Sequence, residues 1–410
     1  MSLPEFISFL IFIIRSNNMK FLSTFSVAPF ATLMLSLMIV GSPVLSQDTE
    51  RVYDPADPAI GYNLISYKSD NPLELDEYFT AIDELVAVKA DHVNLVVFRR
   101  VGVDGKIDFR SGPKLWTIYM AAQYAKDNNL KVTLTPIFET ETGSAWRGDW
   151  NPYGTTRLNF TRHYTILLRQ LASVAARTDA DKLNVGSELV SFVNDPRNHH
   201  YFNVMVALCG KLFEGELGYN ANWDNSQSVS VKEIFWDHPR IKSMSVSMYP
   251  YNRLATLEEA NQSDLDPELF AQAVSSRWSA IVMGELLPYA AALKDGQGMP
   301  VSIGEFGAVA LNLCALTPAS SQPSDEVDAK EQEAVIMGLI HSVDQLGYEM
   351  PEITIWQWGI GDLYDRFGLN PFHESPQQST ALEILEFMQT ADTPEVEGND
   401  EETTVSPEGQ

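Results

Sequence analysis

The sequence predicts a single (β/α)8 barrel, the TIM barrel of the α/β class. Three observations support this prediction: eight short apolar runs rich in β-branched residues, amphipathic segments between them, and a core without a linker or internal repeat. Short apolar runs are typical of strands buried on both faces of a parallel sheet. Strands and helices that alternate over about 250 residues or more are typical of a barrel.

The eight expected strands form the inner wall of this barrel. They occupy residues 60–66, 92–98, 131–138, 182–186, 216–222, 243–249, 300–304 and 352–358. In a barrel the carboxyl ends of all the strands meet at one face, and the catalytic groups of such enzymes lie there. The residues that end each strand are therefore the ones to inspect for chemistry.

Five segments have the periodicity of amphipathic helices: 73–89, 114–128, 157–178, 268–293 and 328–346. Pro113 and Pro196 lie where helices are expected to begin, because a missing N–H costs little in the first turn. Gly347 follows the last segment, as expected of a C-terminal cap. The stretch after the fifth strand is the least regular, with only a short helix expected over 229–238.

Acidic residues dominate the charge of the chain. Its 410 residues include 55 Asp and Glu but only 28 Lys and Arg, which gives a formal net charge of −27. Such a surface repels phosphate backbones and anionic membranes, so we expect no nucleic acid and no anionic membrane surface as partner. A neutral substrate suits this charge better than a polyanion.

The sequence offers no pattern for a metal, a cofactor or a disulfide scaffold. Two cysteines, Cys209 and Cys314, exclude a four-cysteine metal site, and Cys209 is expected to be a buried thiol. Whether the two cysteines pair is left open. The histidines lack metal-ligand spacing, and no Gly-rich phosphate loop follows a strand. Ser187 and Ser302 have no nearby His motif, which argues against a serine hydrolase.

Residues 1–46 are expected to form a secretory leader. They contain a basic start, an apolar run over 30–40, and the small residues Val44 and Ser46, which favour cleavage before Gln47. The run is short for a membrane span, so we expect no integral membrane domain and a secreted or periplasmic protein. The alternative is an uncleaved N-terminal membrane anchor, and a second apolar run upstream leaves the start codon open.

The other end of the chain, 391–410, is expected to be a disordered acidic tail. It carries seven Asp and Glu, no Lys or Arg, and no aromatic residue. Such a segment cannot bury enough apolar surface to offset the entropy of ordering. The catalytic domain is therefore predicted over 47–390.

Two glutamates follow expected strands directly. Glu188 comes after the fourth strand and Glu305 after the seventh; Gly186 stands two residues before Glu188, and Gly304 directly precedes Glu305. Two carboxylates facing each other across a barrel mouth are what glycoside hydrolysis requires, since one donates a proton and the other attacks or activates water. Glu139 and Glu141 are read as ordinary loop residues, and Glu285 lies inside a helical pattern.

Aromatic residues follow two other strands. Tyr249 ends the sixth strand, and Trp356 and Trp358 end the eighth. Aromatic faces at the same rim as the carboxylates suit the binding of a sugar ring.

These residues resemble clan A of the retaining glycoside hydrolases, and more narrowly glycoside hydrolase family 113, typified by β-mannanases. Five segments carry the resemblance in order: 146–149 (WRGD), 185–189 (VGSEL), 219–224 (YNANWD), 249–250 (YP) and 304–307 (GEFG). Three positions depart from it. Ser187 stands where many clan A enzymes have Asn, and Phe306 and Ala308 replace the expected Ile and Tyr. A long loop is expected over 311–325, above the site.

The resemblance implies that Glu188 is the acid/base and Glu305 the nucleophile. Glu188 must then hold a proton, so burial or the charge of Glu305 should raise its pKa. Tyr249 and an arginine after the second strand, Arg99 or Arg100, are the groups expected to keep Glu305 ionised.

The remaining candidates would contact the sugar. Arg147 and Asn222 are polar contacts implied by the resemblance. Trp146, Trp223, Trp356 and Trp358 are the candidates for ring stacking. Of these, Trp223 and Trp358 are favoured, and Trp356 is expected to be packed in the core.

The predicted function is a retaining glycoside hydrolase that acts on a β-linked hexose polysaccharide or oligosaccharide, β-mannan first. Two alternatives stay open: a non-catalytic carbohydrate-binding barrel, and a transglycosylase that uses the same carboxylate pair. A lyase acting on uronates is disfavoured, because it would need a basic cleft. Endo or exo action and the oligomeric state are left open.

Overall fold

The computed structural model describes residues 58–66, 74–141, 146–222, 238–261, 263, 266–347, 350–358, 367–372 and 375–391. The chain divides into two units, Met1–Val52 and Tyr53–Gln410, and every described residue belongs to the second. The expected leader and all of the expected acidic tail after Ala391 lie outside the described residues. So do Trp223 and all of the expected 229–238 helix except His238.

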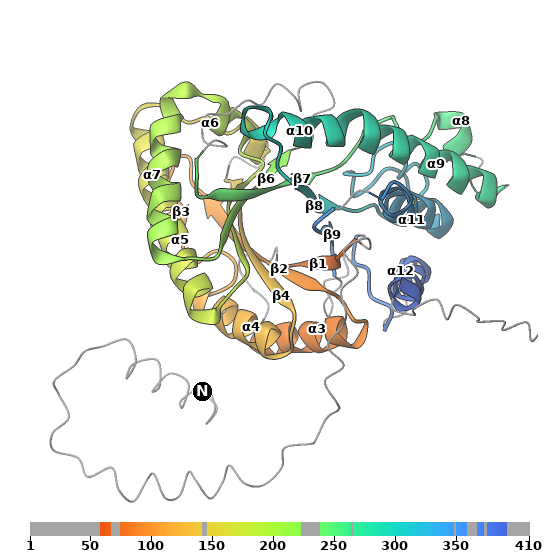
Figure 1. The fold of residues 1–410 in the computed structure, drawn as a ribbon, viewed down its shortest axis with the longest axis horizontal. Helices are drawn as coiled ribbons and strands as arrows, with labels where there is room; N and C mark the ends of the chain where they lie inside the picture. Colours follow the sequence, from red (N-terminus) through yellow and green to blue (C-terminus); the bar gives the residue numbers. More distant parts are fainter. Residues whose placement is uncertain are drawn as a thin grey trace, which may run out of the picture. The chain divides into compact units, whose positions relative to one another are not determined.

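The described strands close a parallel barrel (Figure 1). Its strands are β1 (Ile60–Ile65), β2 (His92–Val101), β4 (Lys131–Thr140), β5 (Lys182–Ser187), β6 (Glu216–Asn222), β7 (Ile241–Ser247), β8 (Val301–Phe306) and β9 (Ile353–Ile355). Each pairs in parallel with its neighbours, and β1 closes the ring by pairing with both β9 and β2. The short β3 (Ile107–Asp108) adds an antiparallel extension to β2. All eight predicted strands and the (β/α)8 fold are confirmed.

Helices surround the barrel on its outer side (Figure 1). They are α3 (Leu75–Ala87), α4 (Leu115–Asp127), α5 (Gly154–Thr178), α6 (Val190–Asn194), α7 (Pro196–Leu212), α8 (Leu257–Ala260), α9 (Pro267–Ile281), α10 (Leu287–Gly296), α11 (Ala329–Gln345) and α12 (Gln378–Ala391). The expected 268–293 helix is interrupted by a π-helical turn over Val282–Leu286 between α9 and α10. Among the described residues, no helix is both long and apolar enough to cross a membrane.

Local signals set the helix ends as the sequence suggests. Pro196 opens α7, where the Asp195 side chain accepts the N–H of Arg197. Gly347 follows α11 with a left-handed φ of 55°, a conformation that glycine adopts without steric cost.

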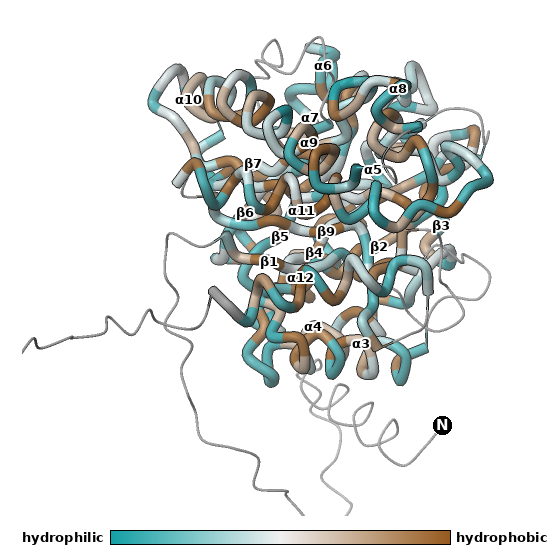
Figure 2. The backbone as a smooth tube through the Cα atoms, turned by 90° about the vertical axis from the view of Figure 1, so that its right-hand side faces the viewer, coloured by the Kyte–Doolittle hydropathy of each residue, from teal (hydrophilic) through white to brown (hydrophobic). Residues whose placement is uncertain are grey.

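The core lies between the barrel and its helices. Along the helices, hydrophobic residues (brown) alternate with hydrophilic ones (teal) in Figure 2. Trp278 of α9 packs edge-on against Phe306 at the end of β8, with the ring centroids 5.1 Å apart. Its indole N–H donates to the Val335 carbonyl of α11. This contact fixes the strand that carries Glu305. Cys209 and Cys314 are both buried and free, as expected for Cys209.

Register shifts concentrate where the strands approach the mouth. They occur between Asn184 and Ser187 of β5, between Val246 and Ser247 of β7, and between Ile303 and Phe306 of β8. Such irregularities re-aim side chains at strand ends. In this barrel they bracket both candidate carboxylates.

Candidate active site

The structure brings the two predicted carboxylates to one end of the barrel. Glu305 lies within β8, and Glu188 directly follows β5; they are only 7% and 4% exposed. The backbone at Glu188 is left-handed, with a φ of 53°. Its N–H donates to the Asn220 carbonyl of β6 over 2.8 Å, which holds this uncommon conformation in place.

A single arginine contacts both carboxylates. Arg147 lies in the short 3-10 helix Arg147–Asp149 that follows β4. Its Nη2 lies 2.6 Å from Glu188 Oε2 and 3.8 Å from Glu305 Oε2. Because one nitrogen makes both contacts, the two oxygens cannot be farther apart than the sum of these distances. Arg147, a predicted sugar contact, is therefore also the cation of the carboxylate pair.

Glu305 has further partners from β7 and its loop. The Tyr249 hydroxyl donates to Glu305 Oε1 over 3.1 Å, as the sequence analysis expected. Ser247, the last residue of β7, is a hydrogen-bond partner of the same carboxyl group. Three side chains thus favour the ionised form of Glu305: Arg147, Tyr249 and Ser247.

Burial and the charge of Glu188 outweigh those three partners. Together they raise the pKa of Glu305 to about 8. We expected the raised pKa on Glu188; the structure raises it on Glu305, because this carboxyl group is buried beside a second negative charge. Glu305 therefore holds a proton more tightly than an exposed glutamate does.

Trp146 lies beside the acid/base candidate. Its indole N–H donates to Glu188 Oε2 over 3.2 Å, and the residue is 42% exposed. A side chain on Gly148 would collide with this ring, so glycine is required where the turn folds back on the indole. The indole of Trp146 is thus hydrogen-bonded to Glu188 through its N–H, while part of the residue remains accessible to solvent.

For Arg99, the expected contact with Glu305 is not supported. Arg99 is buried, and its guanidinium donates to the carbonyls of Phe98, Ser111 and Pro113 at 2.6–2.9 Å. It therefore fastens the connection between β2 and α4. Arg100 is exposed, and its role stays a prediction. The cation comes from the WRGD turn, which the sequence had assigned only to sugar contact.

The preference for Trp358 as a stacking platform is also not supported. Trp358 is 2% exposed, its indole N–H donates to Glu84 of α3, and its ring packs edge-on against Tyr62. The bond to a helix of the outer ring draws the indole into the barrel wall. Trp356 is buried too, as expected, and its main-chain N–H donates to the Phe306 carbonyl beside Glu305.

Of the remaining candidates for sugar contact, the structure describes Asn222 but not Trp223. Asn222 ends β6 half-buried, in register with Ser247 of β7. Trp223 lies outside the described residues. Glu285, set aside as a helical residue, indeed lies in the π-helical turn and pairs with Arg253.

Sequence reasoning missed a set of buried polar residues beneath the carboxylates. These are Ser187, Asn220, Ser245 and Ser247, all at or near the ends of β5, β6 and β7. A signal was present: polar side chains in strands predicted to be buried on both faces need partners.

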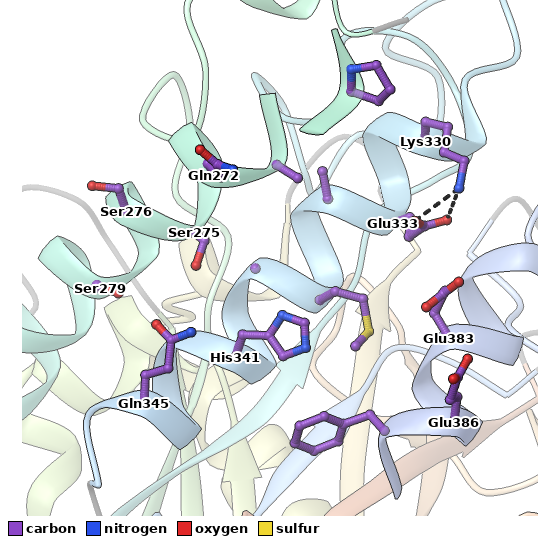
Figure 3. A pocket seen from close by; sticks show the side chains of 16 residues that line it. Gln272, Ser275, Ser276, Ser279, Lys330, Glu333, His341, Gln345, Glu383 and Glu386 are labelled. Atoms are coloured by element: carbon purple, nitrogen blue, oxygen red, sulfur yellow. Dashed lines mark hydrogen bonds and ion pairs between the residues drawn. The ribbon is translucent and has the colours of Figure 1, made fainter. Parts of the chain in front are cut away.

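A groove of about 730 Å³ lies elsewhere, between α9, α11 and α12 (Figure 3). Lys330 and Glu333 of α11 pair along its edge, with Glu383 and Glu386 of α12 opposite. All of its lining residues come from these outer helices, so it is separate from the carboxylate pair. In the described part of the chain, no group of three or more His, Cys, Asp or Glu could hold a metal ion.

Comparison with known proteins identifies relatives of this arrangement. The family model described as Glycoside Hydrolase Family 113 matches residues 77–367. No curated protein matches the chain.

Solved structures share the fold. The GH113 β-mannanase AaManA from Alicyclobacillus acidocaldarius, in complex with ManMIm, has a TM-score of 0.57 at 17% identity and aligns over 82% of this chain and 97% of its own. The endo-β-1,4-mannanase from Thermotoga petrophila has a TM-score of 0.51 at 11% identity and aligns over 83% of this chain and 78% of its own. The GH5-4 broad specificity endoglucanase from Clostridum cellulovorans has a TM-score of 0.51 at 16% identity and aligns over 81% of this chain and 94% of its own.

Proposed function

We propose that this chain, which belongs to Glycoside Hydrolase Family 113 and is a glycoside hydrolase, cleaves β-linked hexose polysaccharides or oligosaccharides with retention of configuration, and that β-mannan is its main substrate. The observation that carries the proposal is the contact of one Arg147 nitrogen with both Glu188 and Glu305. It limits the separation of the two carboxylate oxygens to the sum of two short distances. That sum is below the roughly 6.5–9.5 Å typical of inverting enzymes, which supports a retaining pair.

The proposed mechanism has two steps. Glu305 attacks the anomeric carbon, while Glu188 gives its proton to the glycosidic oxygen as that bond breaks. A covalent glycosyl-enzyme forms, and the leaving sugar departs with the proton. Glu188, now ionised, then takes a proton from water, which attacks the same carbon and releases Glu305 as a carboxylate.

The first step requires that Glu305 is ionised when it attacks the anomeric carbon. Arg147, Tyr249 and Ser247 stabilise negative charge on Glu305 and oppose the rise in its pKa that burial and Glu188 cause. As substrate excludes water from the mouth, these contacts gain strength.

Substrate choice rests on composition and surroundings. A neutral β-mannan suits a chain with a formal net charge of −27. Trp146 offers an accessible ring beside Glu188, and we propose Arg147, Asn222, Trp223 and Trp356 as further sugar contacts. A binding-only barrel would not need two buried carboxylates that share a cation. Transglycosylation stays a second candidate, because it uses the same intermediate with a sugar acceptor.

The deciding experiment is incubation with soluble β-mannan, β-glucan and xylan, read by reducing-end release and by NMR of the first product formed. We expect release from mannan and an initial β-anomer. An initial α-anomer would contradict retention, and activity on glucan alone would contradict the substrate. Oligosaccharides longer than the starting material would indicate transglycosylation.

Substitution of each carboxylate separates their roles. Glu305→Gln keeps shape but removes the attacking charge, so turnover should fall by about 10³-fold or more. Glu188→Ala should retain the first step on a nitrophenyl glycoside, whose leaving group needs no acid, and then stall. Azide should rescue Glu188→Ala and give a β-glycosyl azide.

The matched control is Glu285→Gln, which alters a glutamate that also follows a glycine but pairs with Arg253 in the π-helical turn. It should leave turnover unchanged. A β-configured glycosyl azide from the Glu305 variant, together with an α-configured one from Glu188→Ala, would mean that the two roles are exchanged.

A further inference from the structure

Asn220 is a buried residue that bonds to the main chain of Glu188 and, through its side chain, to Ser247, a partner of Glu305. It lies in β6, 3% exposed, between the strands that carry Glu188 and Ser247. Its main-chain carbonyl accepts the N–H of Glu188 over 2.8 Å. Its side chain points to the serines at the ends of the two neighbouring strands.

The Asn220 amide has a defined direction. Its Nδ2 donates to Ser187 Oγ over 3.1 Å and to Ser247 Oγ over 2.8 Å. Its Oδ1 accepts the hydroxyl of Ser245 over 3.0 Å. Both amide hydrogens are therefore used, and each serine on Nδ2 receives a hydrogen bond at its oxygen.

This direction determines what Ser247 can do. A hydroxyl that accepts from Asn220 has its own hydrogen free to donate, and a carboxylate can only accept. We propose that Asn220 is a positioning residue for the nucleophile: its amide orients the Ser247 hydroxyl so that this hydroxyl donates to the Glu305 carboxylate. The inference deepens the proposed function, because it rests on Glu305 as nucleophile.

Gly304 shows that the barrel makes room for this amide. A Cβ at Gly304 would collide with Asn220 Oδ1 and would lie 2.6 Å from Ser245 Oγ. The glycine directly before Glu305 is thus required by the side chain that we assign to positioning.

The groups that face Glu305 define the expected effect. Glu188 approaches from the end of β5, Arg147 from the turn after β4, and Ser247 and Tyr249 from β7 and its loop. Of these groups, Ser247 is the one that bonds to the Asn220 side chain, whereas Glu188 bonds to the Asn220 main-chain carbonyl, which an alanine would keep. Loss of its hydrogen bond should make Glu305 bind a proton more tightly, so that less enzyme has a charged nucleophile.

The test is the pH dependence of kcat/KM in Ser247→Ala, Asn220→Ala and the double variant. Each single variant should shift the acid limb upward by about 0.5–1 pH unit and lower kcat roughly threefold to tenfold, with little change in KM. The double variant should show the same shift as Ser247→Ala alone, because Asn220 acts through Ser247.

The matched control is Ser302→Ala. Ser302 is an equally buried serine of β8, and its hydroxyl has no hydrogen-bond partner among the described residues. It should leave the acid limb in place. If Asn220→Ala does not fold, Ser245→Ala serves instead: it frees the amide to turn and should shift the limb in the same direction.

Two results would overturn the proposal. One is an unchanged acid limb in Asn220→Ala or Ser245→Ala, expected if the amide faces the other way and Ser247 donates to it. The other is a double variant whose shift is the sum of the single shifts.

A substrate-free measurement separates this inference from the proposed function. Titration of ¹³C-labelled glutamate carboxyls by NMR, with Glu305→Gln used to assign the signal, should show the same upward shift in Ser247→Ala. This result can hold even if mannan is not hydrolysed.

Discussion

At the scale of single residues, Arg147 decides the electrostatics of the site. Its charge is set between two buried carboxylates, and it opposes the rise in the pKa of Glu305 that burial and Glu188 cause. The sequence pointed to Arg99 or Arg100 for this task. Arg99 and Arg100 lie near the end of β2, whereas Arg147 lies in the segment that follows β4, and only the path of that segment brings its charge to the pair.

Arg147→Met is therefore expected to lower kcat/KM by about 10²-fold and to raise the pKa of Glu305 further, since a stabilising charge is removed. The acid limb of the pH profile should move to higher pH. Arg197→Met is the control, because Arg197 pairs with Asp195 at the start of α7. An Arg147 variant with an unchanged pH profile would contradict the assignment.

At the scale of elements, α11 holds the connection from β8. Glu331 of α11 is fully buried and accepts the main-chain N–H groups of Leu313 and Ala315 at 2.7 and 2.9 Å. Both residues belong to the loop that the sequence predicted over 311–325. Burial raises the pKa of Glu331 to about 7, although the main-chain bonds lower it.

This raised pKa predicts a pH-dependent stability. Between about pH 4.5 and 7 the folded chain keeps a proton on Glu331 that the unfolded chain has lost, so stability declines as pH rises through that window, by up to about 3 kcal/mol. Glu331→Gln resembles the protonated side chain and should flatten the decline of Tm between pH 5 and 7. Glu333→Gln, on the same helix, should leave the slope as it is. Equal slopes in wild type and Glu331→Gln would show that Glu331 does not titrate there.

The opposite end of the barrel carries a buried ion pair. Lys182 at the start of β5 lies 3.2 Å from Glu352, just before β9, and 3.7 Å from Glu216 of β6. Burial alone would raise the pKa of Glu352, but Lys182 and His92 outweigh it and lower the pKa to about 2. The amino-terminal face of a barrel is associated with stability rather than catalysis.

Lys182→Met should therefore destabilise the fold by about 3–5 kcal/mol, because it leaves Glu352 buried without its partner. Replacing both residues, with Lys182→Met and Glu352→Leu together, should recover much of the loss. Chemical denaturation measures both. A double variant no more stable than the single one would argue against an unpaired charge as the cause.

At the scale of the whole molecule, export would expose the two cysteines of the chain to an oxidising compartment. We propose that the protein is secreted or periplasmic and that cleavage after Ser46 leaves Gln47 at its start. Expressed with its own leader, it should appear outside the cytoplasm with that N-terminus by mass spectrometry. Intact Met1 or Met19 on exported protein would refute this.

The cysteines give a second readout of the exported protein. Cys209 and Cys314 are buried and free, and burial raises the pKa of the Cys209 thiol to about 12. Both thiols should therefore resist oxidation and react with a thiol reagent only after unfolding.

The sequence by itself determined the eight strands, most of the helices and the two strand ends that carry Glu188 and Glu305. Those features are local, because hydrophobic periodicity and the residue that follows a strand are written in consecutive positions. Only the tertiary structure decided that Arg147 rather than Arg99 contacts both carboxylates, and that the Trp358 indole binds Glu84. Those outcomes depend on which loops and helices meet across the barrel, and such contacts join residues far apart in the chain.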